Sequence, residues 1–387
     1  ALEDQRLTLG REMEALAAAK GALEVEVEEY ESRVNQLRGR DVTADERIAS
    51  LRAPIFLTEN LPETDHPREE AWLEEVESQI KSAGFTFHPR LIRAFHTSLK
   101  VADLAPLTVL AGISGTGKSE LPRLYADVGG IPLLELPVQP SWDSPQDLFG
   151  FFNYTDGRLK AEPLSRLFRQ VMDESDPLRR GPVMVLLDEM NLARVEYYFA
   201  DLLSKLESRR GAKDAANKVA RSRASITLDV GPGHDPIALF PDERILFVGT
   251  MNDDESTLTL SDKVLDRACL LTFPAPAKLD WTEQKRGFRR AKRLSWNAWS
   301  DWTRTPNSEG TTVKLNELND TMRLVNRPFG HRLFRAIQAY IGAYPVAGES
   351  DAAWADQFAM KILPRLRGLE CEDSTVAGAL SRLESQV

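Results

Sequence analysis

The chain has 387 residues, of which 42% are hydrophobic and 28% charged, and 49 Lys and Arg against 59 Asp and Glu give a formal net charge of −10. This composition predicts a soluble globular protein of about two or three domains, and it excludes wholesale disorder and a uniformly basic nucleic-acid coat. Two cysteines and five scattered histidines argue against a disulfide framework or a zinc cluster, so a reducing cytoplasm is the expected location. No apolar run approaches the roughly 18 residues of a membrane span.

Residues 1–40 are predicted to form one long helix. Apolar residues recur at intervals of seven, and others follow three of them by four positions: Leu2, Leu9, Leu16, Leu23, Tyr30 and Leu37, with Met13, Val27 and Val34. This seam, interrupted at Arg6 and Lys20, predicts a coiled coil, with a solvated helix packed on its own domain as the alternative. Because the chain begins with Ala1 rather than Met inside this pattern, we expect further sequence upstream.

The next two segments differ in their periodicity. Residues 41–66 contain two prolines and show weak periodicity, which predicts a linker. Apolar residues four apart then predict a helix over Pro67–Ala83, and a second helix is expected over His88–Ala102. We therefore assign residues 67–105 to helices at the N-terminal side of the next module.

An α/β pattern follows over residues 106–273. Short apolar runs predict strands at Leu107–Ala111, Ile131–Val138, Val183–Leu187 and Arg244–Gly249. Because helical patterns lie between these strands, the expected fold is α/β with a largely parallel, buried sheet. Strand signals stop after Phe273, and residues 274–387 are predicted to be helical.

The most specific motif is the segment Gly112-Ile-Ser-Gly-Thr-Gly-Lys118-Ser119, which fits G-x-x-x-x-G-K-[ST] between a predicted strand and a predicted helix. Its backbone N–H groups and the helix N-terminus favour bound phosphate. Lys118 is expected to reach the β- and γ-phosphates, and Ser119 to ligate Mg²⁺. The candidate nucleotide-binding residues are Gly112, Ser114, Gly115, Thr116, Gly117, Lys118 and Ser119.

Two further strand ends carry polar residues that complete a hydrolytic site. The apolar strand from Val183 ends in Asp188 and Glu189, about 70 residues after the phosphate loop. Asp188 is expected to hold Mg²⁺, and Glu189 to polarise the attacking water. A third strand ends at Asn252, which we expect to touch the γ-phosphate or to orient the water, although such an Asn also opens turns.

These motifs resemble those of the AAA+ ATPases, and within them the McrB-like branch related to MoxR proteins. The similar segments are GISGTGKSE, LLDEMNLARVEYYFADLLSKLE and VGTMNDDESTLTLSDKVLDRACLLTF. The resemblance makes Lys118 and Ser119 the Walker A residues, Asp188 and Glu189 the Walker B residues, and Asn252 sensor 1. It also makes Arg267 the arginine finger that reaches a neighbouring subunit, and Arg332 the sensor-2 arginine of a helical lid, with Arg327 as a competitor.

The resemblance carries further expectations about assembly and activity. The segments SWDSPQDLFGFFNYTDGRLKAEPLSRLF and SITLDVGPGHDPIALFPDERILFVGT resemble hairpins that face the pore of a ring in relatives. A finger acting across an interface implies a homo-oligomer, and we expect a hexameric ring or spiral. An McrB-like motor would use Mg²⁺ and ATP, or GTP, and act on DNA or on an McrC-like nuclease partner in restriction and phage defence. The alternatives are a MoxR-like chaperone that remodels proteins and a nucleotide-locked coiled-coil scaffold.

One charged segment remains outside these motifs. Lys285–Arg293 has six cations in nine residues, and four tryptophans surround it, at positions Trp281, Trp296, Trp299 and Trp302. Cations interleaved with aromatic residues bind nucleic acid through phosphates and stacking. A helix with core tryptophans and a solvated basic face is favoured over direct DNA contact or docking of an acidic partner.

Overall fold

The computed structural model describes residues 16, 20–21, 23–30, 42–214, 216–252, 260–274, 292–303, 309–346, 349–366, 368–369 and 374–386. Most of the predicted coiled coil lies outside these residues. Within its described part, residues 23–30 are helical and Leu23, Val27 and Tyr30 are exposed, so the coiled coil stays a prediction. In the described part of the chain, no helix is both long and apolar enough to cross a membrane.

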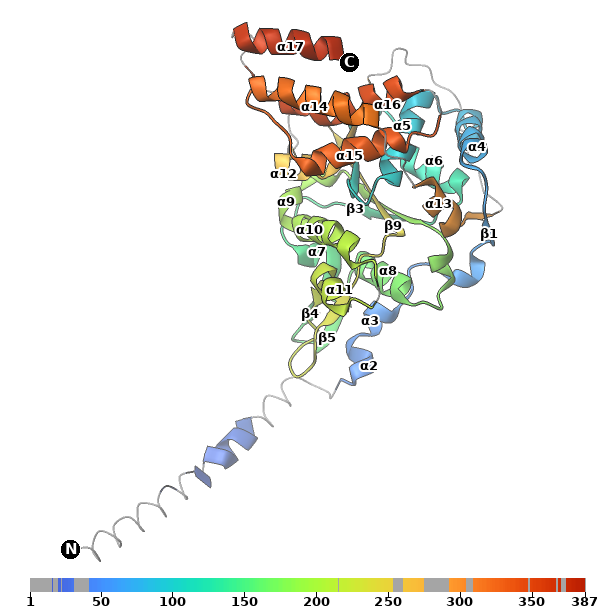
Figure 1. The fold of residues 1–387 in the computed structure, drawn as a ribbon. Helices are drawn as coiled ribbons and strands as arrows, with labels where there is room; N and C mark the ends of the chain where they lie inside the picture. Colours follow the sequence, from blue (N-terminus) through green and yellow to red (C-terminus); the bar gives the residue numbers. More distant parts are fainter. Residues whose placement is uncertain are drawn as a thin grey trace, which may run out of the picture.

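A parallel sheet of five strands forms the centre of the molecule (Figure 1), which confirms the predicted α/β class. Its order is β10-β2-β9-β6-β3, with β2 at Leu107–Gly112, β3 at Leu133–Pro137, β6 at Val183–Asp188, β9 at Ile245–Asn252 and β10 at Ala268–Thr272. Four of the strands match predicted ones. The fifth strand, β10, was not predicted. Its short apolar run does not alternate between polar and apolar residues, so the pattern cannot distinguish a strand from the end of a helix.

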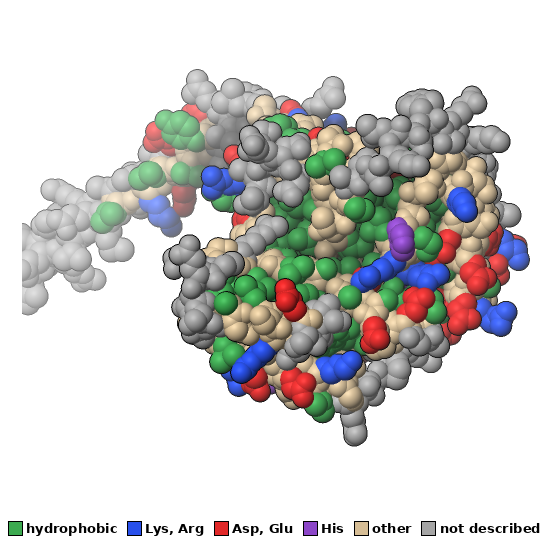
Figure 2. Space-filling model, turned by 90° about the horizontal axis from the view of Figure 1, so that it is seen from above, with side chains coloured by type: hydrophobic (Ala, Val, Ile, Leu, Met, Phe, Trp, Pro, Cys, Tyr) green, Lys and Arg blue, Asp and Glu red, His purple; other side chains and the backbone are tan. Residues whose placement is uncertain are grey.

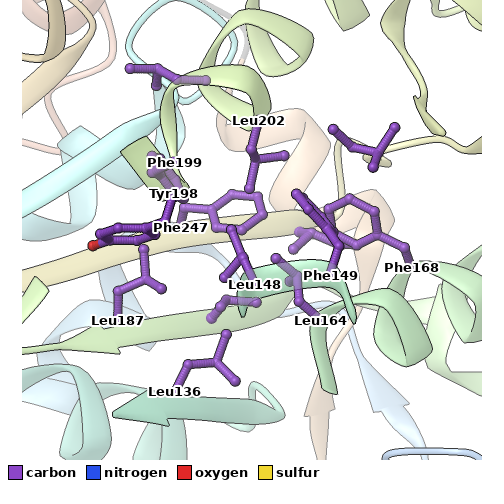
Figure 3. Close-up of a cluster of buried hydrophobic side chains, with 14 of the residues drawn as sticks. Leu136, Leu148, Phe149, Leu164, Phe168, Leu187, Tyr198, Phe199, Leu202 and Phe247 are labelled. Atoms are coloured by element: carbon purple, nitrogen blue, oxygen red, sulfur yellow. The ribbon is translucent and has the colours of Figure 1, made fainter. Parts of the chain in front are cut away.

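The central strands β2, β6 and β9 are mostly apolar because both faces of the sheet are covered. Along β9, Ile245 and Phe247 enter one hydrophobic cluster, and Leu246 and Val248 enter the cluster on the opposite face. The first cluster contains aromatic side chains from the sheet and from the elements that cover this face, as Figure 3 shows for Phe247 of β9, Phe168 of α8 (Pro163–Met172) and Phe199. Alternation between two buried faces explains why these strands have no polar side.

Helices cover the sheet between and beyond the strands. On one face lie α4 (Glu69–Ser82), α5 (Pro89–Lys100), α6 (Glu120–Gly129) and α13 (Trp296–Trp302). On the other lie α7 (Pro145–Phe149), α8 (Pro163–Met172), α9 (Val195–Tyr198) and α10 (Ala200–Arg209). Two shorter helices, α11 (Lys218–Ala224) and α12 (Asp262–Leu265), follow along the chain. The two helices predicted before the first strand are thereby confirmed as α4 and α5.

The C-terminal helices gather at one end of the molecule. They are α14 (Glu309–Leu324), α15 (His331–Gly342), α16 (Ser350–Gln357) and α17 (Ser374–Gln386). Leu315 of α14, Ile337 of α15 and Leu383 of α17 share a separate small core. These helices lie at the end opposite the hairpin of β4 (Gly150–Asn153) and β5 (Arg158–Ala161), as Figure 1 shows. A π-helical segment, Phe358–Ile362, continues α16.

Two antiparallel hairpins occur where the sequence predicted them. The first pairs β4 (Gly150–Asn153) with β5 (Arg158–Ala161), and Gly157 in its turn has φ of 64°. The second pairs β7 (Ile226–Leu228) with β8 (Ile237–Leu239). The hairpins touch each other, since the hydroxyl of Tyr154 donates a 2.9 Å hydrogen bond to Asp229.

The segment predicted as a linker, residues 41–66, is part of the folded body from residue 42 onward. Its short helices α2 (Ala44–Arg47) and α3 (Ala49–Arg52) bury Leu51 in the main core. Ser50 donates a hydrogen bond to the Leu159 carbonyl, and Arg47 donates one to the Val230 carbonyl, so both hairpins are contacted. Four-residue helices bury too few side chains to produce a periodic pattern, which is why the sequence suggested a linker.

The basic segment Lys285–Arg293 lies outside the described residues except for its last two positions. Arg293 is 3% exposed and donates to the carbonyls of Pro177 and Leu178, so it has a structural role. Trp299 and Trp302 of α13 are buried beside Trp72 of α4, which confirms that these tryptophans are core residues. Part of the predicted lid therefore packs on the α/β core rather than with α14 and α15.

The end of the molecule that carries the C-terminal helices has a mixed surface. Figure 2 shows this face, with hydrophobic side chains gathered near its middle. Its Lys and Arg side chains are interspersed with Asp and Glu toward the rim. The described part of this face is therefore not a continuous basic surface.

Candidate functional site

The predicted phosphate-loop residues meet Asp188, Glu189 and Asn252 at one edge of the central sheet. Strands β2, β9 and β6 are neighbours and parallel, so their carboxyl ends lie side by side. Gly112 at the end of β2 is in register with Asn252 at the end of β9, and Asp188 ends β6. Carboxyl ends of parallel strands are where α/β proteins bind ligands.

The phosphate loop connects β2 to the N-terminus of α6. Gly115 and Gly117 have φ of 79° and 87°, a region that residues with a Cβ rarely adopt. The Lys118 ammonium group is 2.5 Å from the Ile113 carbonyl, so the lysine reaches back over the loop. The loop therefore presents a cation and a helix N-terminus to the same space, as phosphate binding requires.

Asp188 is the centre of a hydrogen-bond network beneath this loop. Its Oδ1 accepts from the Ser119 hydroxyl at 2.6 Å and from the Thr250 hydroxyl at 2.7 Å. Its Oδ2 lies 3.2 Å from the guanidinium of Arg123 on α6. Hydrogen bonding to Glu135 raises the pKa of Arg123, so this guanidinium remains charged. The network fixes the carboxylate directly beside the hydroxyl expected to share its metal.

Glu189 adopts a left-handed backbone conformation, with φ of 52° and ψ of 48°. This conformation is unusual for a residue with a side chain and is found preferentially at functional sites. Its N–H donates to the Thr250 hydroxyl at 2.9 Å, and its Oε1 accepts from the Asn252 amide at 3.2 Å. The carboxylate and the amide expected to handle the water are therefore in direct contact.

A pocket of about 460 Å³ opens over these groups. Ligand sites typically measure about 300–1,000 Å³. Its lining residues are Gly84, Phe85, Thr86, Phe87, Ser114–Ser119, Glu120, Arg123, Glu189, Thr250 and Asn252. Phe87 closes on the phosphate loop, because a Cβ built on Gly117 would lie 3.0 Å from its ring. The pocket thus has a charged floor and an aromatic wall.

The structure does not bring Arg267 and Arg332 to this pocket. Among the described lining residues neither arginine occurs. Both instead contact Glu207 of α10, whose Oε1 lies 2.9 Å from Nε of Arg267 and 3.1 Å from a terminal nitrogen of Arg332. Residues from three distant segments are therefore joined at a second place in the molecule.

Sequence reasoning missed several residues of the site. Thr250 precedes Asn252 by two positions in β9, so the period of two in a strand could have placed both on one face. Arg123 lies one helical turn after Glu120 and pairs with it, so the local sequence does not indicate that Arg123 also contacts Asp188. No local motif marks the Gly84–Phe87 loop or Glu207. Only the tertiary fold brings the loop to the pocket and Glu207 to the two arginines.

Comparison with known proteins does not assign a function to the chain. The family described as Domain of unknown function (DUF8727) matches residues 285–385. No curated protein matches the chain. A solved crystal structure of a Cytophaga hutchinsonii protein, provisionally named an ATPase, is similar over 81% of this chain and 96% of its own, with 13% identity and a TM-score of 0.46. Likeness at this level does not identify a function.

Proposed function

We propose that the chain is a nucleoside-triphosphatase of the AAA+ type. One observation carries the proposal: the Ser119 hydroxyl bonds to Asp188 at 2.6 Å, beside a Glu189 that contacts Asn252 at 3.2 Å. A hydroxyl and a carboxylate in contact suit Mg²⁺, which takes few protein ligands and completes its shell with water and substrate phosphates. This fits the described residues, in which no cluster of three or more His, Cys, Asp or Glu forms a metal cage.

The residues divide the chemistry between them. Mg²⁺ held by Ser119 and Asp188 would supply charge neutralisation at the phosphates. Lys118 and the loop N–H groups bind the phosphates and stabilise charge that develops during transfer. Glu189 accepts a proton from the attacking water, and Asn252 holds that carboxylate in place. Positioning and electrostatics of this kind account for most catalysis of phosphoryl transfer.

We further propose that the chain works as a homo-oligomer, as a hexameric ring or spiral. Arg267 and Arg332 lie together on Glu207 and away from the pocket of their own chain, which supports action on a neighbouring subunit's nucleotide. The C-terminal helices would then form the lid, and the paired hairpins would face the pore. An arginine supplied by a neighbouring subunit typically increases the rate of phosphoryl transfer by about 10³- to 10⁵-fold.

The biological role that we propose is an McrB-like motor acting on DNA or on a partner nuclease. The motif order and the two hairpins support this reading, and we favour ATP over GTP as substrate. Turnover should be compared with and without DNA, and after purification with the products of neighbouring genes. Stimulation by DNA or by a co-purified nuclease supports the motor, whereas stimulation by a protein substrate alone supports a MoxR-like chaperone.

The site itself is tested by Lys118→Ala. Removing the cation that contacts the phosphates should lower the hydrolysis rate by about 100-fold or more, because binding and charge stabilisation are lost together. Phosphate release from ATP and GTP measures the effect, with Lys81→Ala, an exposed lysine at the end of α4, as the control. Undiminished hydrolysis by Lys118→Ala would contradict the assignment of this pocket.

A further inference from the structure

A carboxylate that the proposed mechanism does not use joins the two candidate arginines. Oε1 of Glu207 contacts Arg267 at 2.9 Å and Arg332 at 3.1 Å. The side chains of Glu207 and Arg267 are 22% and 14% exposed, whereas that of Arg332 is 52% exposed. The shared oxygen thus lies between an arginine that is largely buried and one that faces solvent.

The atoms involved in these contacts decide what Glu207 can do. The Arg267 atom nearest to Glu207 is Nε, at 2.9 Å, but this buried nitrogen makes no hydrogen bond, so the two groups are held by charge rather than by a directed donor. A guanidinium presents donors along several edges, so a carboxylate near one edge leaves others for a phosphate. Glu207 therefore keeps Arg267 close to Arg332 by charge.

The electrostatics agree with this arrangement. Two guanidinium groups held close together repel each other, and a carboxylate between them removes most of that repulsion. Two cations and one anion leave one net positive charge at the cluster. The cluster therefore still attracts an anion such as the terminal phosphate of a nucleotide.

The backbone that carries Arg267 is also held by the C-terminal helices. The buried Lys361, in the π-helical segment after α16, donates to the carbonyls of Leu265 at 3.3 Å and Asp266 at 3.4 Å, and also to that of Ala268. Arg365 forms an ion pair with the Asp266 side chain. π-Helical turns are frequent at functional sites. The turn that presents Arg267 is thus fixed by main-chain contacts on either side of the arginine.

We propose that Glu207 is a positioning residue that holds Arg267 and Arg332 as one unit for the triphosphate of a neighbouring subunit. The proposal rests on the proposed function, because it needs a hydrolysed nucleotide and an oligomer. Glu207 is not among the described residues that line the pocket. It acts on the transition state through the orientation of the two arginines, so its loss should affect turnover more than binding.

The test compares Glu207→Ala and Glu207→Gln with a control on the same helix, Asp201→Ala, which changes an exposed acidic residue of α10. Misplacing a catalytic group by about 1 Å costs up to about 100-fold, so Glu207→Ala should lower kcat by about 10- to 100-fold with KM changed less than about twofold. Glu207→Gln keeps an acceptor oxygen but loses the charge, so it should retain more activity than Glu207→Ala. Asp201→Ala should match the unchanged protein.

A double-variant cycle separates positioning from a general loss of structure. If Glu207 acts through Arg267, adding Glu207→Gln to Arg267→Ala should cost little further activity, because coupled residues are not additive. Thermal unfolding should show that Glu207→Gln is still folded at the assay temperature, although the loss of the carboxylate between two guanidinium groups lowers its stability. Unchanged kcat, increased kcat, or full additivity with Arg267→Ala would each overturn the proposal.

The same experiments keep the two proposals apart. Hydrolysis that survives Lys118→Ala counts against the nucleotide site and therefore against the proposed function. Hydrolysis that is lost in Lys118→Ala and Arg267→Ala but retained in Glu207→Ala leaves the proposed function intact and removes only the role of Glu207.

Discussion

The proposed nucleotide pocket and the cluster of Glu207 with Arg267 and Arg332, called the Glu207 cluster below, are built in different ways. The polar groups of the pocket come largely from the ends of three neighbouring strands, and its central oxygen, Oδ1 of Asp188, accepts from Ser119 and Thr250. The Glu207 cluster joins helix α10, the turn before β10 and the start of α15. The first site is organised by one sheet edge, and the second by the packing of the C-terminal helices on the core.

The geometry of the two sites therefore depends on different parts of the fold. Residues of the pocket should keep their geometry whenever the sheet is folded, because strand register sets their positions. Residues of the Glu207 cluster should respond to the placement of the C-terminal helices, which have a small core of their own. The proposed motor function would use both: a rigid site for chemistry and a second site that depends on the C-terminal helices.

The largest effect in a direct comparison is expected from Arg267→Ala. Loss of an arginine acting in trans should lower hydrolysis by about 10³-fold while nucleotide binding persists. Phosphate release measures the first quantity and a fluorescent nucleotide analogue the second. Mixing Arg267→Ala with Lys118→Ala should restore activity, because some interfaces then pair an intact pocket with an intact arginine. Activity that stays absent in the mixture would place Arg267 in the pocket of its own chain and remove the contrast between the two sites.

A smaller loss is expected from Glu189→Gln in the pocket. The amide keeps the contact with Asn252 but cannot accept a proton, so hydrolysis should fall by about 100-fold with little change in nucleotide affinity. Mixing this variant with Arg267→Ala should restore activity to the interfaces that combine the two intact residues. Wild-type turnover by Glu189→Gln would exclude this carboxylate as the base.

The smallest effect, a loss of stability, is expected from Thr250→Val. This variant tests whether contacts between neighbouring strand ends hold the pocket together. The buried hydroxyl donates to Asp188 and accepts from the N–H of Glu189, so its removal leaves two groups without this partner. We expect about 1–3 kcal/mol of lost unfolding free energy. Denaturant unfolding measures the loss, and Thr250→Ser, which keeps the hydroxyl, is the matched control.

The residues that the structure brings together at the pocket could be selected from the sequence because their signals are local. Lys118 and Ser119 are adjacent in one loop, Asp188 and Glu189 in one strand end, and Asn252 closes a third apolar strand. The sequence predicted the second site poorly. Arg267 and Arg332 were identified as separate residues from a resemblance, and nothing in the pattern around Glu207 indicated a common partner. The linker expectation for residues 41–66 was wrong for a related reason, because α2 and α3 are too short to produce periodicity.

By itself, the sequence determined the parallel α/β core and the order of the phosphate-loop and strand-end motifs, because strand burial and glycine conformation leave regular local patterns. The two hairpins were expected from the resemblance. Only the tertiary structure decided that α2 and α3 pack on the hairpins, that α13 belongs to the core, and that one carboxylate contacts both arginines. The physical reason is the range of the interactions. Backbone geometry acts over a few residues, whereas ion pairs such as Glu207 with Arg332 depend on how elements far apart in the chain pack in space.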